Sequence, residues 1–235
     1  NDLLQYWELL LDHFDEPFAD ASALPTYVIS KYCREFVKVV LSGDGGDEQW
    51  GGYGSYRRQL QIQKLRDWFP SPWLRHLAGR SARASAMGIG RLNPLLASRI
   101  GLYADLLEIH EGLLHGRLDR HMSNASIGTI AGERLVGQLA DANDPETAYI
   151  HPWATGLDAS MLVDIRNFMV GDVLRKVDMM SMLTGLEVRV PLLDHRIVEH
   201  SAGLSWQDKV TTRETKTIAR RLYRDVLPPA IIAGQ

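Results

Sequence analysis

The sequence contains one cysteine, Cys33, among its 235 residues. One thiol cannot form an intramolecular disulfide, and a structural zinc site usually takes several Cys or His ligands. This cysteine usage suits a reducing compartment such as the cytoplasm. Positive and negative charges are also nearly balanced, with 26 Lys and Arg and 29 Asp and Glu. A duplex-binding protein needs a cationic field to displace counterions, so nucleic acid is disfavoured as a partner.

Long apolar runs are also absent. Leu9–Leu11 and Val39–Leu41 are soon interrupted by charge or glycine, whereas a helix that spans a bilayer needs about 20 apolar residues. We therefore expect no membrane partner. The hydrophobic (45%) and charged (23%) fractions are typical of one large globular domain or two small ones. The chain opens at Asn1 without an initiating Met or an export signal, and its helical pattern begins almost at once, so it is expected to be a piece of something longer.

The periodicity predicts a mainly α protein with one or few short parallel β-strands. The run Phe36–Leu41, closed by Ser42-Gly43, predicts a strand buried on both faces, as in a parallel sheet. Thr211 and Glu214 form a capping-box pattern for a last helix that Pro228-Pro229 would stop. Helical patterns cover residues 3–14 (with Asp2 as N-cap), 24–32, 56–69, 92–96, 102–118, 135–139 and 160–180.

Glycines and acidic residues are clustered directly after the predicted strand. Six of the 20 glycines lie between positions 43 and 54, together with Asp44, Asp47 and Glu48. Open α/β sheets bind ligands at the carboxyl ends of their strands, and clustered carboxylates need a cation or a helix N-terminus. Mg²⁺ suits this pattern, because it takes one or two carboxylates plus substrate phosphates. The alternative is a plain strand-to-helix turn, whose acids gain ~0.3–1 kcal/mol from the helix dipole.

Lysines further along the chain could bind an anion. Lys176 interrupts an apolar helical pattern, so a phosphate or a carboxylate is expected beside it. Glu187, Arg189 and Asp194 are better explained as internal ion pairs that fix a turn before Pro191. Lys216 belongs to a cationic stripe on the last predicted helix, which is either solvated or, at Lys216, turned to a polyphosphate. The stripe consists of Arg213, Lys216, Arg220 and Arg224.

Two long segments resemble the synthetase domain of glutamine-hydrolysing asparagine synthetases. They are Leu41–Tyr53 (LSGDGGDEQWGGY) and Lys176–Asp194 (KVDMMSMLTGLEVRVPLLD), in the order that the family has. Asp15–Asp20 (DEPFAD) and Lys216 are also similar to that family. The resemblance implies the C-terminal part of an α/β adenine-nucleotide alpha-hydrolase-like (ATP pyrophosphatase) domain. Residues 1–60 would end its nucleotide-binding portion, and residues 61–235 would form its helical portion.

The resemblance also implies chemistry. In that family the aspartate side chain attacks the α-phosphorus of Mg-ATP, and ammonia from a glutaminase domain then displaces AMP. Ser42 and Gly43 match positions that touch ATP, and Lys216 would also bind the nucleotide. Asp44 matches an acid important for acyl-adenylate formation, and Asp47 matches a Mg²⁺ ligand. Lys176 would steady the phosphates where negative charge develops.

The sequence departs from the family's pattern at several points. Gln49-Trp50 replaces two apolar residues, which we read as a packing change, and Met179 stands where Arg or Lys is usual. The phosphate-steadying role would then depend on Arg175 or Lys176. The family's first nucleotide loop, S-G-G-x-D-S, and the glutaminase cysteine occur nowhere in the chain. We therefore expect this chain alone to be inactive. Open alternatives are a relative that amidates or cyclises another carboxylate, a non-catalytic helical scaffold, and a homodimeric state.

Overall fold

A computed structural model describes residues 6–14, 16–119 and 148–233. Contacts between Cα atoms divide the chain into two compact units. Unit 1 takes Asn1–Gln49 and Asp164–Leu204, and unit 2 takes Trp50–Val163 and Ser205–Gln235. Within the described ranges, no helix is both long and apolar enough to cross a membrane.

Unit 1 contains a two-stranded parallel sheet, the one sheet in the described part of the chain. Strand β1 (Val39–Leu41) pairs with β2 (Glu187–Arg189), with Val40 opposite Val188. The parallel direction of the predicted strand is therefore confirmed. Its partner is separated from it by about 150 residues of sequence and was not predicted. The helical elements of unit 1 are α1 (Trp7–His13), α2 (Ala23–Arg34), α3 (Gly46–Trp50, which ends at the unit boundary), η4 (Met169–Leu174), α11 (Arg175–Met182), η5 (Pro191–Leu193) and α12 (His195–Ala202).

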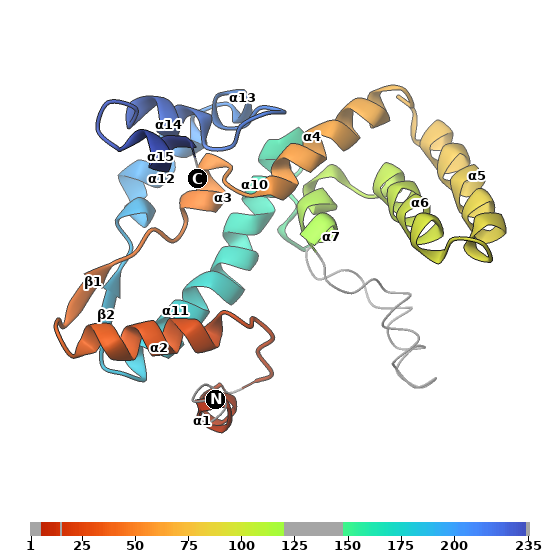
Figure 1. The fold of residues 1–235 in the computed structure, drawn as a ribbon. Helices are drawn as coiled ribbons and strands as arrows, with labels where there is room; N and C mark the ends of the chain where they lie inside the picture. Colours follow the sequence, from red (N-terminus) through yellow and green to blue (C-terminus); the bar gives the residue numbers. More distant parts are fainter. Residues whose placement is uncertain (1–5, 15, 120–147, 234–235) are drawn as a thin grey trace. The chain divides into compact units, whose positions relative to one another are not determined.

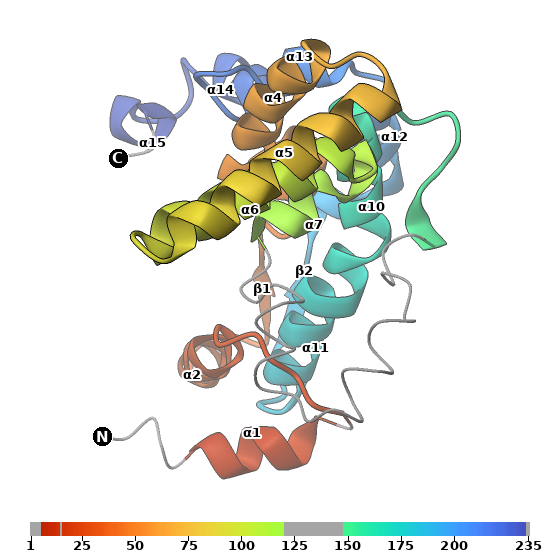
Figure 2. The same cartoon turned by 90° about the vertical axis from the view of Figure 1, so that its right-hand side faces the viewer.

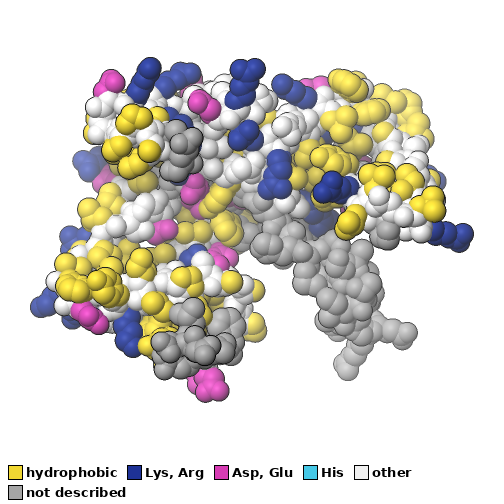
Figure 3. Space-filling view, viewed as in Figure 1, with side chains coloured by type: hydrophobic (Ala, Val, Ile, Leu, Met, Phe, Trp, Pro, Cys, Tyr) yellow, Lys and Arg dark blue, Asp and Glu magenta, His cyan; other side chains and the backbone are white. Residues whose placement is uncertain are grey.

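The core of unit 1 lies between its helices. Leu10, Ala23, Tyr27 and Met180 form one buried cluster, which joins α1, α2 and α11. The sheet is covered much less, because Val39 is 39% exposed and Leu41 is 73% exposed. The prediction of a strand buried on both faces is thus wrong for β1, since a sheet of two described strands leaves most of β1 uncovered. Figure 3 shows hydrophobic side chains gathered over β1 and the end of α2.

The segment before α11 contains a π-helical turn, η4, that continues directly into α11. A π turn holds one residue more than an α-helical turn and is frequent at functional sites. In Figures 1 and 2, α11 runs in the direction opposite to β2, which follows it. The first turn of α11 therefore lies toward the carboxyl ends of both strands.

Unit 2 is helical in its described residues. Tyr56, Leu60, Leu157, Met161 and Val210 form its main buried cluster, and Ile62, Leu106 and Leu114 form a second one. Proline opens two of its helices at a position where its missing N–H costs nothing. Its helical elements are α4 (Gly54–Asp67), α5 (Pro72–Gly90), α6 (Pro94–Glu108), η2 (Glu111–Leu113), α7 (Leu114–Asp119), α10 (Gly156–Arg166, whose end belongs to unit 1), α13 (Trp206–Lys209), α14 (Thr217–Leu222) and α15 (Pro229–Ala233).

Several predicted helix boundaries are wrong. The helix expected over 102–118 breaks after Glu108, because Ile109 and His110 are extended and the His110 ring accepts a hydrogen bond from the Gly112 N–H. The Thr211 hydroxyl does accept a hydrogen bond from the Glu214 N–H, but in a turn.

The helix expected after the capping box is α14, which begins only at Thr217 and already ends at Leu222. Pro228-Pro229 does not stop it, because Pro229 opens a further helix, α15. Arg213 therefore lies outside α14, and the predicted cationic stripe does not form. The predicted Asp2 cap and the helix over 135–139 lie outside the described residues.

Candidate active site

The loop Ser42–Asp47 leaves the carboxyl end of β1. The Ser42 N–H donates to the Arg189 carbonyl (2.9 Å), which extends the ladder by one bond. The Ser42 hydroxyl donates to Asp44 Oδ2 (2.5 Å), and the Gly46 N–H donates to the Gly43 carbonyl (3.3 Å). The loop is therefore closed by its own hydrogen bonds before α3 begins.

Two of the loop's glycines are required by the segment that follows β2. Gly45 has φ +78°, and a Cβ there would come 2.2 Å from Leu193 Cδ2. A Cβ at Gly46 would come 2.9 Å from Leu192 Cδ1. Glycine at these positions thus lets the loop backbone pack directly on the η5 turn. The two long segments singled out in the sequence meet here, at the same end of the two parallel strands.

Gln49 strengthens the same junction. It is 1% exposed, and its Nε2 donates to the Leu192 carbonyl (2.8 Å). Its Oε1 accepts from the Ser201 hydroxyl (3.2 Å), so the amide links α3 to η5 and α12. The departure at Gln49 is therefore more than a packing change, because hydrogen bonds replace apolar contact.

Gly43 differs from its neighbours. It has no positive φ, and a Cβ there would meet no atom within 4 Å. Nothing in the described part of the chain explains why this position is glycine. Open space beside a glycine backbone, next to Ser42 and Asp44, leaves room for a ligand to come close.

The carboxylates Asp44 and Asp47 are half-buried, and both belong to this loop. No group of three or more His, Cys, Asp or Glu side chains among the described residues could hold a metal by itself. Mg²⁺ commonly binds through one or two carboxylates and completes its shell with phosphates and water. The donors present thus fit Mg²⁺ that arrives with a nucleotide and do not fit a protein-only metal centre.

Lys176 lies in the first turn of α11 and is paired with an acid. Its Nζ donates to Asp20 Oδ2 at 2.5 Å, and both side chains are largely buried. The N–H and the hydroxyl of Ser22 also donate to the Asp20 carboxylate, each at 2.8 Å. Burial alone would raise the pKa of Asp20, but the bonds from Lys176 and Ser22 outweigh it and lower the pKa to about 2. The predicted anion beside Lys176 is thus a carboxylate of the chain itself.

A second acid, Asp172, lies one helical turn before Lys176, within η4. Burial and the neighbouring Asp20 carboxylate raise the pKa of Asp172 to about 6, although the Lys176 charge acts in the opposite direction. Its Oδ1 is buried without a hydrogen-bond partner. Lys176 is therefore surrounded by two carboxylates of opposite character, one held ionised and one easily protonated.

Met179 stands where the family usually has a basic residue, and the structure shows what it and the neighbouring basic residues contact. The Met179 side chain packs against the core of unit 1, and the Arg175 guanidinium forms an ion pair with Glu16. Both basic residues that could replace the family's usual one are thus engaged with acids of the DEPFAD segment. Asp20 is 156 positions from Lys176, and only the segment's likeness to the family marked it in the sequence.

The internal ion pairs expected of Glu187, Arg189 and Asp194 are present in part. Arg189 Nε lies 2.7 Å from Glu187 Oε1, as an exposed pair. Asp194 instead pairs with Arg196 through both oxygens (2.8 and 2.9 Å) and caps α12 by accepting from the Arg196 N–H. Hydrogen bonds from Arg196 strongly lower the pKa of Asp194. Ion pairs are thus present, but one lies within β2 and the other caps α12, so neither fixes a turn before Pro191.

Lys216 belongs to unit 2, whereas the other predicted site residues lie in unit 1. It precedes α14 and has φ +53°, the one positive φ among the described non-glycine residues. Left-handed backbone at a lysine costs free energy and is more frequent at functional sites. The structure thus unites Ser42, Gly43, Asp44 and Asp47 in one loop and places Lys176 in the same unit, but it does not place Lys216 relative to them.

A parallel strand pair with an acidic, glycine-rich loop at its carboxyl end is the arrangement at which open α/β sheets bind ligands. The family model for asparagine synthase matches residues 1–235. A putative glutamine-hydrolysing asparagine synthetase of Mycobacterium tuberculosis is 32% identical over 226 residues, which are 94% of this chain and 32% of the relative. Asparagine synthetase 1 of Bacillus subtilis is 28% identical over 235 residues, 94% of this chain and 33% of the relative.

A shorter match covers 53 residues at 51% identity, in a putative asparagine synthetase of Methanocaldococcus jannaschii. It spans 23% of this chain and 10% of that relative. No solved structure matches the chain. The chain belongs to the asparagine synthase family, and it spans about a third of the length of the curated relatives that match most of it.

Proposed function

We propose that this chain forms part of the ATP site of an amide ligase that makes asparagine from aspartate. One observation carries the proposal: the Ser42–Asp47 loop packs, through Gly45 and Gly46, on the η5 turn at the carboxyl end of β2. Two sequence segments that resemble the family thus form one surface, at the sheet edge where α/β proteins bind ligands. The names of the matching relatives support the same reaction.

The proposed roles follow the likeness to the family. Ser42 and Gly43 contact the nucleotide, because Gly43 has open space beside it. Asp44 supports formation of β-aspartyl-AMP, and Asp47 contributes to Mg²⁺ binding. When bound, Mg²⁺ would neutralise phosphate charge. Lys176 stabilises charge on the phosphates, and Asp20 holds its ammonium in place. Lys216 binds the nucleotide.

The rest of the reaction requires parts outside this chain. Ammonia would come from a glutaminase domain, and the first nucleotide loop would come from another segment of the parent protein. The division into 1–60 and 61–235 stays a prediction, as do a cytoplasmic location and a homodimer. We expect the isolated chain to show no aspartate-dependent ATP–pyrophosphate exchange, and measurable exchange would contradict this incomplete-site proposal.

The central test measures aspartate-dependent ATP–pyrophosphate exchange in the full-length protein. Asp47→Ala should lower the exchange rate by about 10²–10³-fold, the usual cost of losing a charge-stabilising group. Glu35→Ala is the matched control, because Glu35 is an exposed acid of unit 1 outside the loop, and its rate should not change. An unchanged rate in Asp47→Ala would remove Asp47 from the Mg²⁺ ligands.

Met179 favours one alternative within the family, an enzyme that amidates or cyclises a different carboxylate. Its side chain is partly buried and packs against the core of unit 1, at a position where the family usually has a basic residue. Product analysis of the full-length protein with ATP, glutamine and aspartate separates the two activities. Asparagine as the product supports our proposal, whereas ATP turnover without asparagine supports the alternative. A scaffold protein would show neither Mg-ATP binding nor stabilisation by it.

A further inference from the structure

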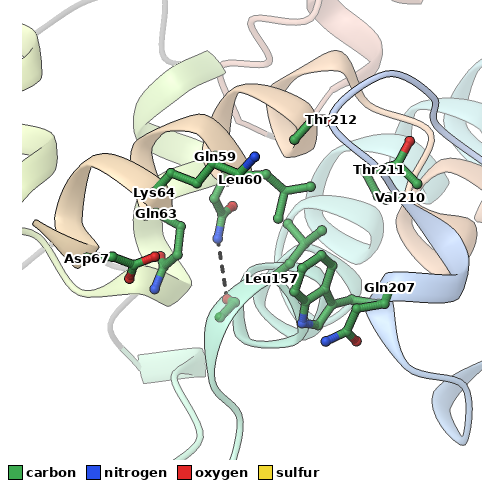
Figure 4. Close-up of a pocket in the computed structure, with 12 residues that line it drawn as sticks. Gln59, Leu60, Gln63, Lys64, Asp67, Leu157, Gln207, Val210, Thr211 and Thr212 are labelled. Carbon is green, nitrogen blue, oxygen red and sulfur yellow. Dashed lines mark hydrogen bonds between the residues drawn. The ribbon is translucent and has the colours of Figure 1, made fainter.

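Unit 2 contains cavities of different character, and the one beside α4 has an apolar wall. Leu60 and Trp206 belong to this wall (Figure 4). The Gln59 Nε2 donates to the Gly156 carbonyl beside it (3.3 Å). The Oε1 atoms of Gln59 and Gln63 are buried without a partner in the described part of the chain, and a molecule in the cavity cannot reach them. These oxygens therefore cannot select a ligand.

A second cavity, of about 530 Å³, lies beside α14 and is rich in arginine. Three of its eight lining residues are Arg220, Arg221 and Arg224. The first two belong to α14, and Arg224 lies in the turn that follows it. Residues three and four positions apart on a helical turn lie on the same face, so the three side chains share one side of the cavity. Two members of the cationic pattern seen in the sequence thus meet here, together with Arg221.

Arg220 fixes the frame of this cavity. Its Nε donates to the Thr215 carbonyl (2.8 Å), and its Nη1 donates to the Ile232 carbonyl. The guanidinium therefore ties the segment before α14 to α15, which contributes Pro229 and Ile232 to the lining. A guanidinium has five N–H donors, so Arg220 keeps donors beyond these two bonds.

Arg221 and Arg224 have no charged partner within the described part of the chain. Both are exposed, and neither side chain forms a hydrogen bond or an ion pair with a described residue. Glu214 and Asp225 also line the cavity, but within the described ranges neither pairs with these arginines. Three guanidinium groups thus stand against two carboxylates in one concave surface, which concentrates the positive potential.

We propose that the cavity beside α14 binds a phosphate group, either free or carried by a small organic molecule. The planar fork of arginine fits two phosphate oxygens with parallel hydrogen bonds. A phosphate dianion has three oxygens and two charges to share among several guanidinium groups, and a carboxylate has fewer of both. Arg221 and Arg224 can turn to it, because no described residue holds them. Pro229 and Ile232 offer apolar contact to the organic part of a ligand.

This site is distinct from the proposed ATP site. Every residue that lines it belongs to unit 2, whereas the Ser42–Asp47 loop and Lys176 belong to unit 1. Lys216 precedes α14 but does not line the cavity.

The test uses phenyl phosphate as the probe and phenol as its partner without phosphate. Binding to the full-length protein is followed by the broadening of the aromatic proton NMR signals of each compound. At low ionic strength, phenyl phosphate should bind with a Kd on the order of 1 mM, because exposed charges are then least screened. Phenol should show no broadening at the same concentration. Inorganic phosphate, followed by phosphorus NMR, distinguishes the two sources: equal affinity indicates free phosphate, and tighter phenyl phosphate binding indicates an organic ester.

Substitutions in and after α14 localise the binding. Arg221→Gln and Arg224→Gln should each weaken phenyl phosphate binding about 10-fold, the usual effect of losing a hydrogen bond to a charged group. Arg213→Gln is the matched control, since Arg213 is an exposed arginine of unit 2 that does not line the cavity, and its affinity should not change.

The proposal would be overturned by any of three results. They are no broadening of phenyl phosphate up to about 10 mM, roughly ten times the expected Kd, equal binding of phenol, or an equal loss of affinity in Arg213→Gln and Arg224→Gln. Should a variant fail to fold, the comparison of phenyl phosphate with phenol on the unaltered protein decides.

Discussion

The two units of the chain use glycine and apolar side chains in different ways. In unit 1, glycine brings a loop against Leu192 and Leu193, while β1 stays largely exposed. In unit 2, apolar clusters pack between helices, and cavities remain beside α4 and beside α14. A motif can thus be defined by close backbone approach, as in unit 1, whereas a pocket depends on side chains that no short motif contains.

The largest expected effect is a loss of stability at Gly51 in unit 2. Gly51 has φ +67°, and a Cβ there would come 2.1 Å from Val210 Cγ2. Val210 is 1% exposed and β-branched, so its side chain can hardly move away. Left-handed strain and overpacking together should make Gly51→Ala lose about 3 kcal/mol of unfolding free energy, measured by urea denaturation. A loss below about 1 kcal/mol would show that Val210 moves away from the added methyl group.

A smaller effect is expected at Gly45, with Gly43 as its control. The obstructing atom at Gly45 is the end of the more flexible Leu193 side chain, so Gly45→Ala should cost about 2 kcal/mol. Gly43→Ala should cost less than about 0.5 kcal/mol, because the space beside it is open. If Gly43 contacts the nucleotide, only this second variant should keep its stability and bind Mg-ATP more weakly. Equal losses of stability in both variants would contradict the distinction.

The smallest expected effect concerns Asp172 and depends on pH. Burial and the neighbouring Asp20 raise its pKa from the ordinary value of 3.8 to about 6, so the stability it contributes is present below about pH 4 and is lost as pH rises through 6. Asp172→Asn should therefore stabilise the chain by about 1 kcal/mol at pH 7, a value reduced for partial solvent exposure, and not at pH 4. Urea denaturation at both pH values checks this, and an equal gain at both would exclude a titration effect.

Asp20, in the same cluster, changes stability with pH in the direction opposite to Asp172. Its pKa is lowered to about 2, so its contribution to stability is present above about pH 4 and is lost as pH falls through 2. The two acids flank one lysine, yet they respond to pH in opposite directions. A pH titration of stability thus tests each of them in a separate range.

The sequence predicts those features that depend on local pattern. The helices α2 and α4, the strand before Ser42 and its parallel direction follow from periodicity and from the glycine that closes the strand. The local composition predicts the glycine loop. The reason why glycine is required there, close contact with Leu192 and Leu193, is seen only in the structure. Likeness to the family provided the residue roles, which composition could not provide.

Features that depend on distant partners could not be predicted. Strand β2 has three residues, too few for a periodic signal, and is defined by hydrogen bonds to a segment about 150 positions earlier. The Thr211 pattern failed because a capping box is equally compatible with a turn, and here the Thr211 N–H donates to the Glu214 carbonyl. The orphaned oxygens of Gln59 and Gln63 depend on Glu111 and Gly156, which no local rule connects to α4.

The π-helical turn η4 also affects how this segment can change in length. It extends from Met169 to Leu174, contains Asp172 and ends two positions before Lys176. Because a π turn holds one residue more than an α-helical turn, removing one residue from η4 would restore ordinary α-helical winding and leave the directions of the later side chains nearly unchanged. Lys176 would then stay aligned with Asp20. A single-residue deletion in η4 should therefore be tolerated better than one inside the regular helix α2, which would turn the following residues by about 100° about the helix axis.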